Sequence, residues 1–155
     1  MNMKKSKLLL HVFMLIVLTL ALTACSQVND DLSGKTINVA YVLPFEDTVD
    51  DPDKYDSLMK VTFNDNNEVE HIVYDEIEGS YTLKDNELIV TFENDNEQLD
   101  ITFNDLTESE KSFSLYSASI SDIAYDKKDS SKIDKLSPIR DRLQKGLPIE
   151  LIEIK

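Results

Sequence analysis

The chain has 155 residues, enough for one domain or for one domain with a leader. Sixteen Lys and Arg side chains stand against thirty Asp and Glu, a formal net charge of -14, which excludes a nucleic-acid-binding protein that relies on a basic surface and disfavours attachment to lipid through a polybasic patch. Hydrophobic residues make up 41% of the chain, which is too large a share for disorder over its whole length.

The N-terminal segment is basic and then apolar. Residues 1–7 carry three lysines, and the fifteen residues 8–22 are almost all apolar. A helix of that length spans only ~22 Å, short of the ~30 Å hydrocarbon core of a bilayer. The basic flank and the short apolar run therefore predict a secretory signal rather than a permanent membrane span.

The residues that follow the apolar run are Leu22, Thr23, Ala24 and Cys25. This tetrad resembles the lipobox of bacterial lipoproteins. The resemblance implies a signal peptide over residues 1–24, cleavage between Ala24 and Cys25, and a diacylglyceryl thioether on Cys25 that anchors the protein to the extracytoplasmic face of a cell membrane. The alternative is an ordinary secretory signal followed by an accidental cysteine. Because Cys25 is the only cysteine, no intrachain disulfide can form.

The rest of the chain divides into a short linker and a body. Residues 26–34 are mostly polar and lack periodicity, so we interpret residues 25–34 as the lipidated cysteine with a flexible tether. Residues 35–155 are predicted to form a single β-rich extracytoplasmic domain.

The dominant pattern in this body is an alternation of apolar and polar residues, which is typical of strands with one buried face. The alternating apolar positions are Ile37, Val39, Tyr41, Leu43, Met59, Val61, Phe63, Tyr81, Leu83, Leu88, Val90, Phe92, Leu99, Ile101, Phe103, Phe113 and Leu115. Residues 68–74 also read as a strand, with ambiguous facing, and residues 120–125 show a weaker strand pattern.

Asn and Asp clusters separate these strands. Residues 85–86, 64–67 and 94–96 are rich in the two residue types that tolerate turn conformations best. Short links of this kind join antiparallel neighbours. Residues 61–72 and 90–101 are identical at half of their aligned positions, which indicates one hairpin design used twice. The sequence predicts a mainly β fold, an antiparallel meander that forms an open barrel or a sandwich.

One short helix and a final strand are predicted near the C-terminus. Ser137 suits a helix cap, Pro138 the first helical position and Gly146 the exit. Residues 148–154 then read as the last strand.

Three stretches of the body, SLMKVTFNDNNEV, GSYTLKDNELIVTFE and LDITFNDLTESEKSFSLY, share a further pattern. A strand that ends in Phe and an acidic turn is followed by Gly-x-Tyr-x-Leu, a turn, and Leu-x-Val-x-Phe. Residues 58–115 thereby resemble the lipocalin-like, all-β small lipoproteins of bacteria. The resemblance implies the architecture of that group.

Candidate ligands for a metal ion are carboxylates rather than histidines. His71 is the one histidine after the leader, lies within a predicted strand and has no motif around it, so we interpret it as an ordinary strand residue. A zinc site built on His71 and the lipidated Cys25 is excluded, because one imidazole cannot complete a tetrahedral site.

Five carboxylates fall within eight residues, and calcium favours acidic oxygen ligands of this kind. They belong to Glu46, Asp47, Asp50, Asp51 and Asp53. No stretch has the EF-hand spacing with its central glycine, so we interpret the cluster as solvated turns. A calcium site at Asp50, Asp51 and Asp53 is the alternative.

No motif of a nucleophile with its base, and no glycine-rich phosphate loop, occurs in the sequence. We therefore expect no enzymatic activity and no cofactor. The sequence favours a monomeric acidic interaction module for a cationic protein, peptide or ion. The alternatives are a lipocalin-like carrier of a small apolar ligand and a hydrolase with unrecognised carboxylates. An apolar cavity would favour the carrier, and a filled core with an acidic face would favour the interaction module.

Overall fold

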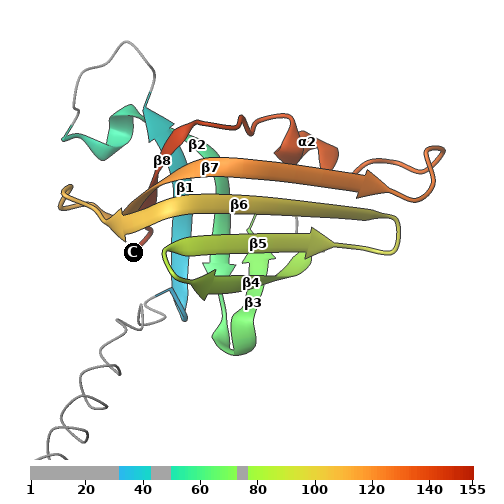
Figure 1. The fold of residues 1–155 in the computed structure, drawn as a ribbon, viewed down its shortest axis with the longest axis horizontal. Helices are drawn as coiled ribbons and strands as arrows, with labels where there is room; N and C mark the ends of the chain where they lie inside the picture. The colour runs from blue at the N-terminus through green and yellow to red at the C-terminus, as the bar shows by residue number, and fades with distance from the viewer. Residues whose placement is uncertain (1–31, 43–49, 73–76) are drawn as a thin grey trace, which may run out of the picture.

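The computed structural model describes residues 32–42, 50–72 and 77–155 (Figure 1). In these residues each strand pairs antiparallel with the next one along the chain, and the first also pairs with the last, which closes a barrel. The strands are β1 (Lys35–Val42), β2 (Tyr55–Phe63), β3 (Glu68–His71), β4 (Glu78–Lys84), β5 (Glu87–Glu93), β6 (Glu97–Glu108), β7 (Ser114–Lys127) and β8 (Pro148–Glu153). The predicted β meander with a short helix and a final strand is confirmed, and the sheet is a closed barrel.

Inward-facing side chains fill the barrel. Phe63, Phe92 and Phe103 are at most 1% exposed, and Val90 and Ile101 are fully buried. Eight strands enclose a space just wide enough for side chains, so these residues pack into one continuous core. A cavity wide enough to admit a water molecule would leave part of these side chains accessible, and they are not.

Strand β1 keeps the predicted alternation. Ile37 and Val39 are buried, and Tyr41 is half-buried and packs against the core. A β-bulge lies in the neighbouring strand β2, where the pairing with β1 skips Leu58. Leu43 lies outside the described residues.

The turn chemistry follows the prediction. Asp85 and Asn86 have φ values of 51° and 65°, and Asn66 and Asn67 have φ values of 65° and 62°. Asn and Asp adopt this left-handed conformation at lower cost than other residues with side chains. The predicted hairpin turns between β4 and β5 and between β2 and β3 are confirmed. The second of these turns contains η3 (Asp65–Asn67).

The C-terminal helix is shorter than predicted. Helix α2 comprises the single turn Ser137–Arg140, and its cap residue is Leu136 rather than Ser137. After this turn the chain continues with i→i−3 bonds from Arg142 to Ile139 and from Leu143 to Arg140, and the Gly146 amide then donates to the Ile120 carbonyl of β7 at 2.7 Å. Gly146 adopts φ of 80°, in keeping with its predicted role as the exit.

The domain begins before the predicted boundary at residue 35. Leu32, which the sequence placed in the tether, is fully buried in the core. Its turn is fixed because the Gly34 amide donates to the Phe63 carbonyl at 2.7 Å and the Lys35 amide to the Leu32 carbonyl at 3.1 Å. A single leucine in a polar stretch gives no periodicity, so the sequence pattern could not reveal this contact.

The predicted cleavage and lipidation site, Ala24 and Cys25, lies outside the described residues. None of the helices in residues 32–42, 50–72 and 77–155 combines the length and the apolar character needed to cross a membrane.

Candidate functional site

The acidic residues that the sequence offered as calcium ligands lie just before β2. Asp50, Asp51 and Asp53 are exposed. The Asp51 carboxylate accepts the Asp53 amide at 3.0 Å and caps η2 (Pro52–Lys54). In the part of the chain that the structure describes, no three His, Cys, Asp or Glu side chains are placed so that they could hold a metal ion.

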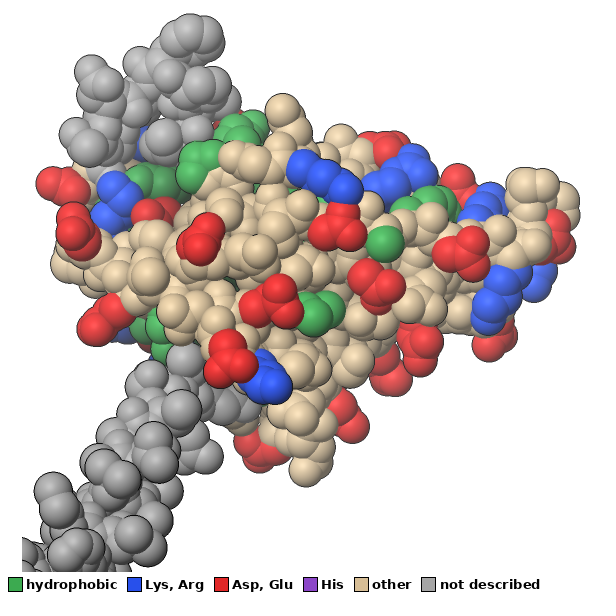
Figure 2. Space-filling model, in the orientation of Figure 1, with side chains coloured by type: hydrophobic (Ala, Val, Ile, Leu, Met, Phe, Trp, Pro, Cys, Tyr) green, Lys and Arg blue, Asp and Glu red, His purple; other side chains and the backbone are tan. Residues whose placement is uncertain are grey.

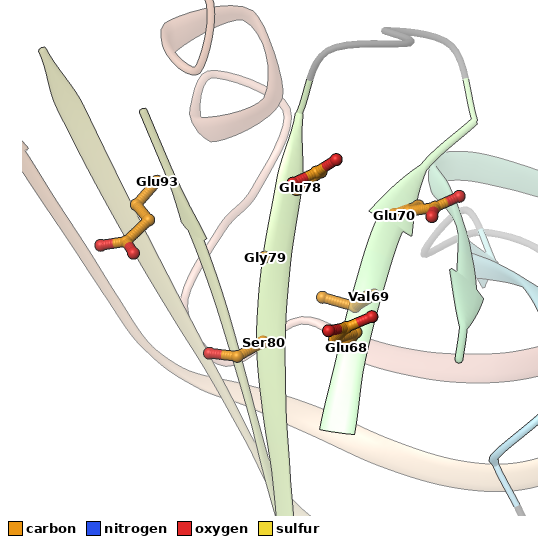
Figure 3. A pocket seen from close by; sticks show the side chains of 7 residues that line it. All are labelled: Glu68, Val69, Glu70, Glu78, Gly79, Ser80 and Glu93. Carbon is orange, nitrogen blue, oxygen red and sulfur yellow. The ribbon is translucent and has the colours of Figure 1, made fainter. Parts of the chain in front are cut away.

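A different set of carboxylates lines a groove of about 500 Å³ on the outer face of β3, β4 and the end of β5 (Figure 3). We call it the acidic groove. Its lining residues are Glu68, Val69, Glu70, Glu78, Gly79, Ser80 and Glu93. Four of these seven residues are glutamates and none is basic, so the groove concentrates negative charge.

Strand register brings these glutamates together. In β3, Val69 and His71 face the core, which leaves Glu68 and Glu70 on the outside. The antiparallel pairing places Glu70 directly opposite Glu78, and both lie at the same end of their strands in Figure 3. Like charges directly opposite each other destabilise a sheet. The pairing of Glu70 with Glu78 is therefore locally unfavourable unless a cation neutralises one of the charges, and the stability of the rest of the barrel maintains it.

Gly79 lies opposite Val69 and, like it, is on the core-facing side of the sheet. A Cβ atom there would lie 2.2 Å from the Thr91 carbonyl oxygen and 3.0 Å from the Phe92 ring. Strand β4 thus approaches β5 more closely than any residue with a side chain would allow. On the outer side, the small Ser80 side chain lines the groove between the glutamates.

The sequence did not single out Glu97, which is the most buried charged side chain. It is 2% exposed. Its carboxylate accepts hydrogen bonds from the Tyr125 hydroxyl at 2.6 Å, the Lys135 amide at 2.7 Å and the Leu136 amide at 3.3 Å, and Asn94 Nδ2 adds a fourth at 3.3 Å. These bonds tie the start of β6 to β7 and to the segment that enters α2.

The hydrogen bonds decide the charge state of Glu97. Burial alone would raise the pKa of this carboxyl, but the bonds from Tyr125, Lys135, Asn94 and Leu136 hold the pKa below its ordinary value. Burial and the neighbouring carboxylate raise the pKa of Tyr125 to about 12. At neutral pH, Glu97 is therefore a carboxylate that accepts a hydrogen bond from the neutral Tyr125 phenol. The Arg140 guanidinium lies 4.6 Å from the centre of the Tyr125 ring, in a cation–π contact.

A second buried carboxylate, Glu150, lies in β8 and is 8% exposed. It accepts the Ser109 hydroxyl at 2.8 Å and the Ser117 hydroxyl at 2.9 Å. The Lys111 pKa is raised, first by a hydrogen bond to Tyr55 and then by the charges around it, which include Glu150. A lysine with a raised pKa stays protonated at neutral pH, so Lys111 itself cannot act as a base toward either serine.

His71 is buried in β3, with its ring centre 6.1 Å from that of Phe92 in an edge-on contact. Burial and then the positive charge of Arg142 lower the pKa of His71. The histidine that the sequence treated as an ordinary strand residue is thus an inward-facing one, and it lies beside a second pocket that is described below.

Comparison of the chain with family models, with curated proteins and with solved structures gave no significant match.

We predict that Glu97→Gln destabilises the domain by about 1–3 kcal/mol at neutral pH, because the new amide group would point a donor at donors already directed to this site. The folded state holds the pKa of Glu97 below its ordinary value of 4.5. The stabilisation by the carboxylate is therefore complete above that value and is lost as the pH falls through the lowered pKa. Urea denaturation of both proteins at a series of pH values measures the difference.

The matched control is Glu87→Gln, which makes the same change at an exposed position of β5. It should alter the free energy of unfolding by less than about 0.5 kcal/mol. The interpretation of Glu97 fails if both variants behave alike, or if the difference between wild type and Glu97→Gln does not shrink on acidification.

Proposed function

We propose that the protein is a lipid-anchored interaction module without enzymatic activity, which presents the acidic groove to a cationic peptide or protein. The anchor is the proposed thioether on Cys25, which would place the domain on the extracytoplasmic face of a cell membrane. The tetrad that ends at Cys25 supports this anchor, as the resemblance to the lipobox indicates.

The observation that carries the proposal is the acidic groove. Four glutamates line it, two of them directly opposite each other across β3 and β4, and no lining residue is basic. A concave site of one sign attracts and steers ligands of the opposite sign. Lys or Arg side chains in the groove would also relieve the repulsion between Glu70 and Glu78.

The filled core favours this function over that of a carrier. A carrier of an apolar ligand needs a cavity with accessible apolar walls. The inward side chains of β5 and β6, such as Val90 and Ile101, are completely shielded. The hydrolase alternative gains no support from Glu97 and Glu150, because several hydrogen bonds already occupy both buried carboxylates.

Barrel closure supports the proposal of a monomer. Because β1 and β8 pair with each other, neither strand offers a free edge that could recruit a second sheet.

We predict that a decalysine peptide binds the wild type more tightly than the double variant Glu70→Gln/Glu78→Gln by about tenfold at an ionic strength of about 0.1 M. Isothermal titration calorimetry of the purified protein measures both affinities. The affinity of the wild type should fall as salt is added, because the groove is open to solvent and its charges are screened.

The control is Glu87→Gln/Glu108→Gln, which removes the same charge at two exposed positions that do not line the groove. Its affinity should stay within about twofold of the wild type, since at about 0.1 M salt exposed charges separated by more than ~10 Å are largely screened. An equal loss of affinity in the two double variants would show that net charge alone attracts the peptide, and would refute the groove as the site.

We predict that Cys25→Ala abolishes the membrane anchor, because no other side chain in the sequence can form the thioether. Metabolic labelling with a radioactive fatty acid followed by cell fractionation is the measurement. The wild type should carry label in the membrane fraction, whereas the variant should carry none. Label on the variant would contradict the lipidation of Cys25.

A further inference from the structure

A second pocket, of about 220 Å³, lies between β2, the end of β3 and the segment that contains α2. Strand β3 pairs with β2 only from Val61 to Phe63. The preceding residues of β2 border α2 instead, and the pocket lies along this junction. Leu58, Met59 and Ile139 form its apolar part, and each is at most 3% exposed.

The polar part of this pocket is cationic. Lys60, His71 and Arg142 line it, and no Asp or Glu does. We call it the cationic pocket. It belongs to the basic side of the domain: residues 127–145 hold seven Lys or Arg and only three Asp, in a chain that otherwise has a large acidic excess. Figure 2 shows most of the Lys and Arg side chains of that face along the margin formed by β7 and the α2 segment.

The charge of Arg142 is not balanced by a carboxylate of the described residues. Its Nη2 donates to the Ser57 carbonyl oxygen at 2.5 Å, which fixes the guanidinium beside the pocket without neutralising it. Basic residues nearby do have acidic partners: Arg140 pairs with Asp141, and Lys145 with Asp122. Lys60 likewise makes no ion pair with the residues that the structure describes. The chain has nearly twice as many acidic as basic residues, so most cations could find an acidic partner. Two cations without such a partner beside one pocket therefore distinguish this pocket from the rest of the surface.

The positive charge of Arg142 acts on His71, which lines the same pocket. Burial lowers the pKa of the imidazole, and the positive charge of Arg142 lowers it further. A neutral imidazole adds polar atoms to the wall without adding charge. The site therefore combines two cations, a neutral imidazole and an apolar floor.

We propose that the cationic pocket binds a small organic carboxylate, with its carboxylate group at Arg142 and Lys60 and its apolar part against the exposed Pro138 ring, above the buried Leu58, Met59 and Ile139. A guanidinium with free N–H groups matches the two oxygens of a carboxylate. The apolar floor adds a term proportional to the area it covers. A volume below the ~300 Å³ of ordinary drug-sized sites limits the ligand to a few carbon atoms.

This site shares no lining residue with the acidic groove, so the inference does not rest on the proposed function. The test is a titration of the purified full-length protein with hexanoate, followed through the imidazole proton resonances in NMR spectra. The His11→Gln variant assigns the resonances of His71. Hexanoate should shift them in a saturable manner, and acetate should bind about threefold more weakly because it lacks most of the apolar part.

Variants identify the cation that binds the carboxylate. Arg142→Gln removes the charge and shortens the side chain, and it should weaken hexanoate binding by about tenfold or more. Lys60→Gln should weaken it as well. The matched control is Arg140→Gln, because Arg140 lies in the same segment but does not line the pocket; it should leave the affinity within about twofold.

Three results would overturn the proposal. The first is the absence of a saturable shift of the His71 resonances with hexanoate. The second is an equal effect of Arg142→Gln and Arg140→Gln, which would indicate a general response to charge. The third is binding of inorganic phosphate or acetate as tight as that of hexanoate, which would show an anion site without a role for the apolar floor.

Discussion

Pairing of β1 with β8 is the constraint on which the rest of the structure depends. The register runs from Ile37 opposite Glu153 to Ala40 opposite Glu150, and the Ile154 amide extends it to the Thr36 carbonyl at 2.9 Å. Closure of eight strands leaves an interior that side chains can fill, and they do fill it. The acidic groove and the cationic pocket both lie on the outer wall and its junctions, which is where the proposed binding would take place.

The two pockets of this small barrel differ in charge. Four carboxylates line the acidic groove on the outer face of β3, β4 and β5, whereas the cationic pocket lies beside the segment of residues 127–145, which holds more Lys and Arg than Asp. Glu97 lies at the start of β6, and its carboxylate accepts the amides of Lys135 and Leu136, which precede α2. The buried carboxylate thus positions the segment that supplies Arg142 to the cationic pocket. Two sites of opposite sign on one domain suit ligands of opposite charge.

The sequence predicted the strands and turns well, because alternation and the Asn and Asp clusters are local signals. The bulge at Leu58 in β2 and the hydrogen bond from Gly146 to Ile120 depend on partners distant in the chain, and no local pattern reports them. Closure of the sheet is equally non-local. Prediction of the acidic groove would have required the register of β3 against β4, because nothing in the sequence distinguishes Glu70 and Glu78 from the other acidic residues of a chain that has thirty. Glu97 was within reach, because the alternation of Leu99 and Ile101 continues back to it.

The central claim is that the barrel interior is filled and that binding occurs on the outside. Xenon is a neutral apolar probe that enters dry cavities and has no charge to draw it to either surface site. Methyl NMR spectra of the protein under increasing xenon pressure therefore test the claim directly. The account predicts no saturable shift for the methyl groups of Val90, Ile101 and Leu151, which are fully buried in the core. Saturable shifts confined to these groups would contradict it and would favour an internal ligand site.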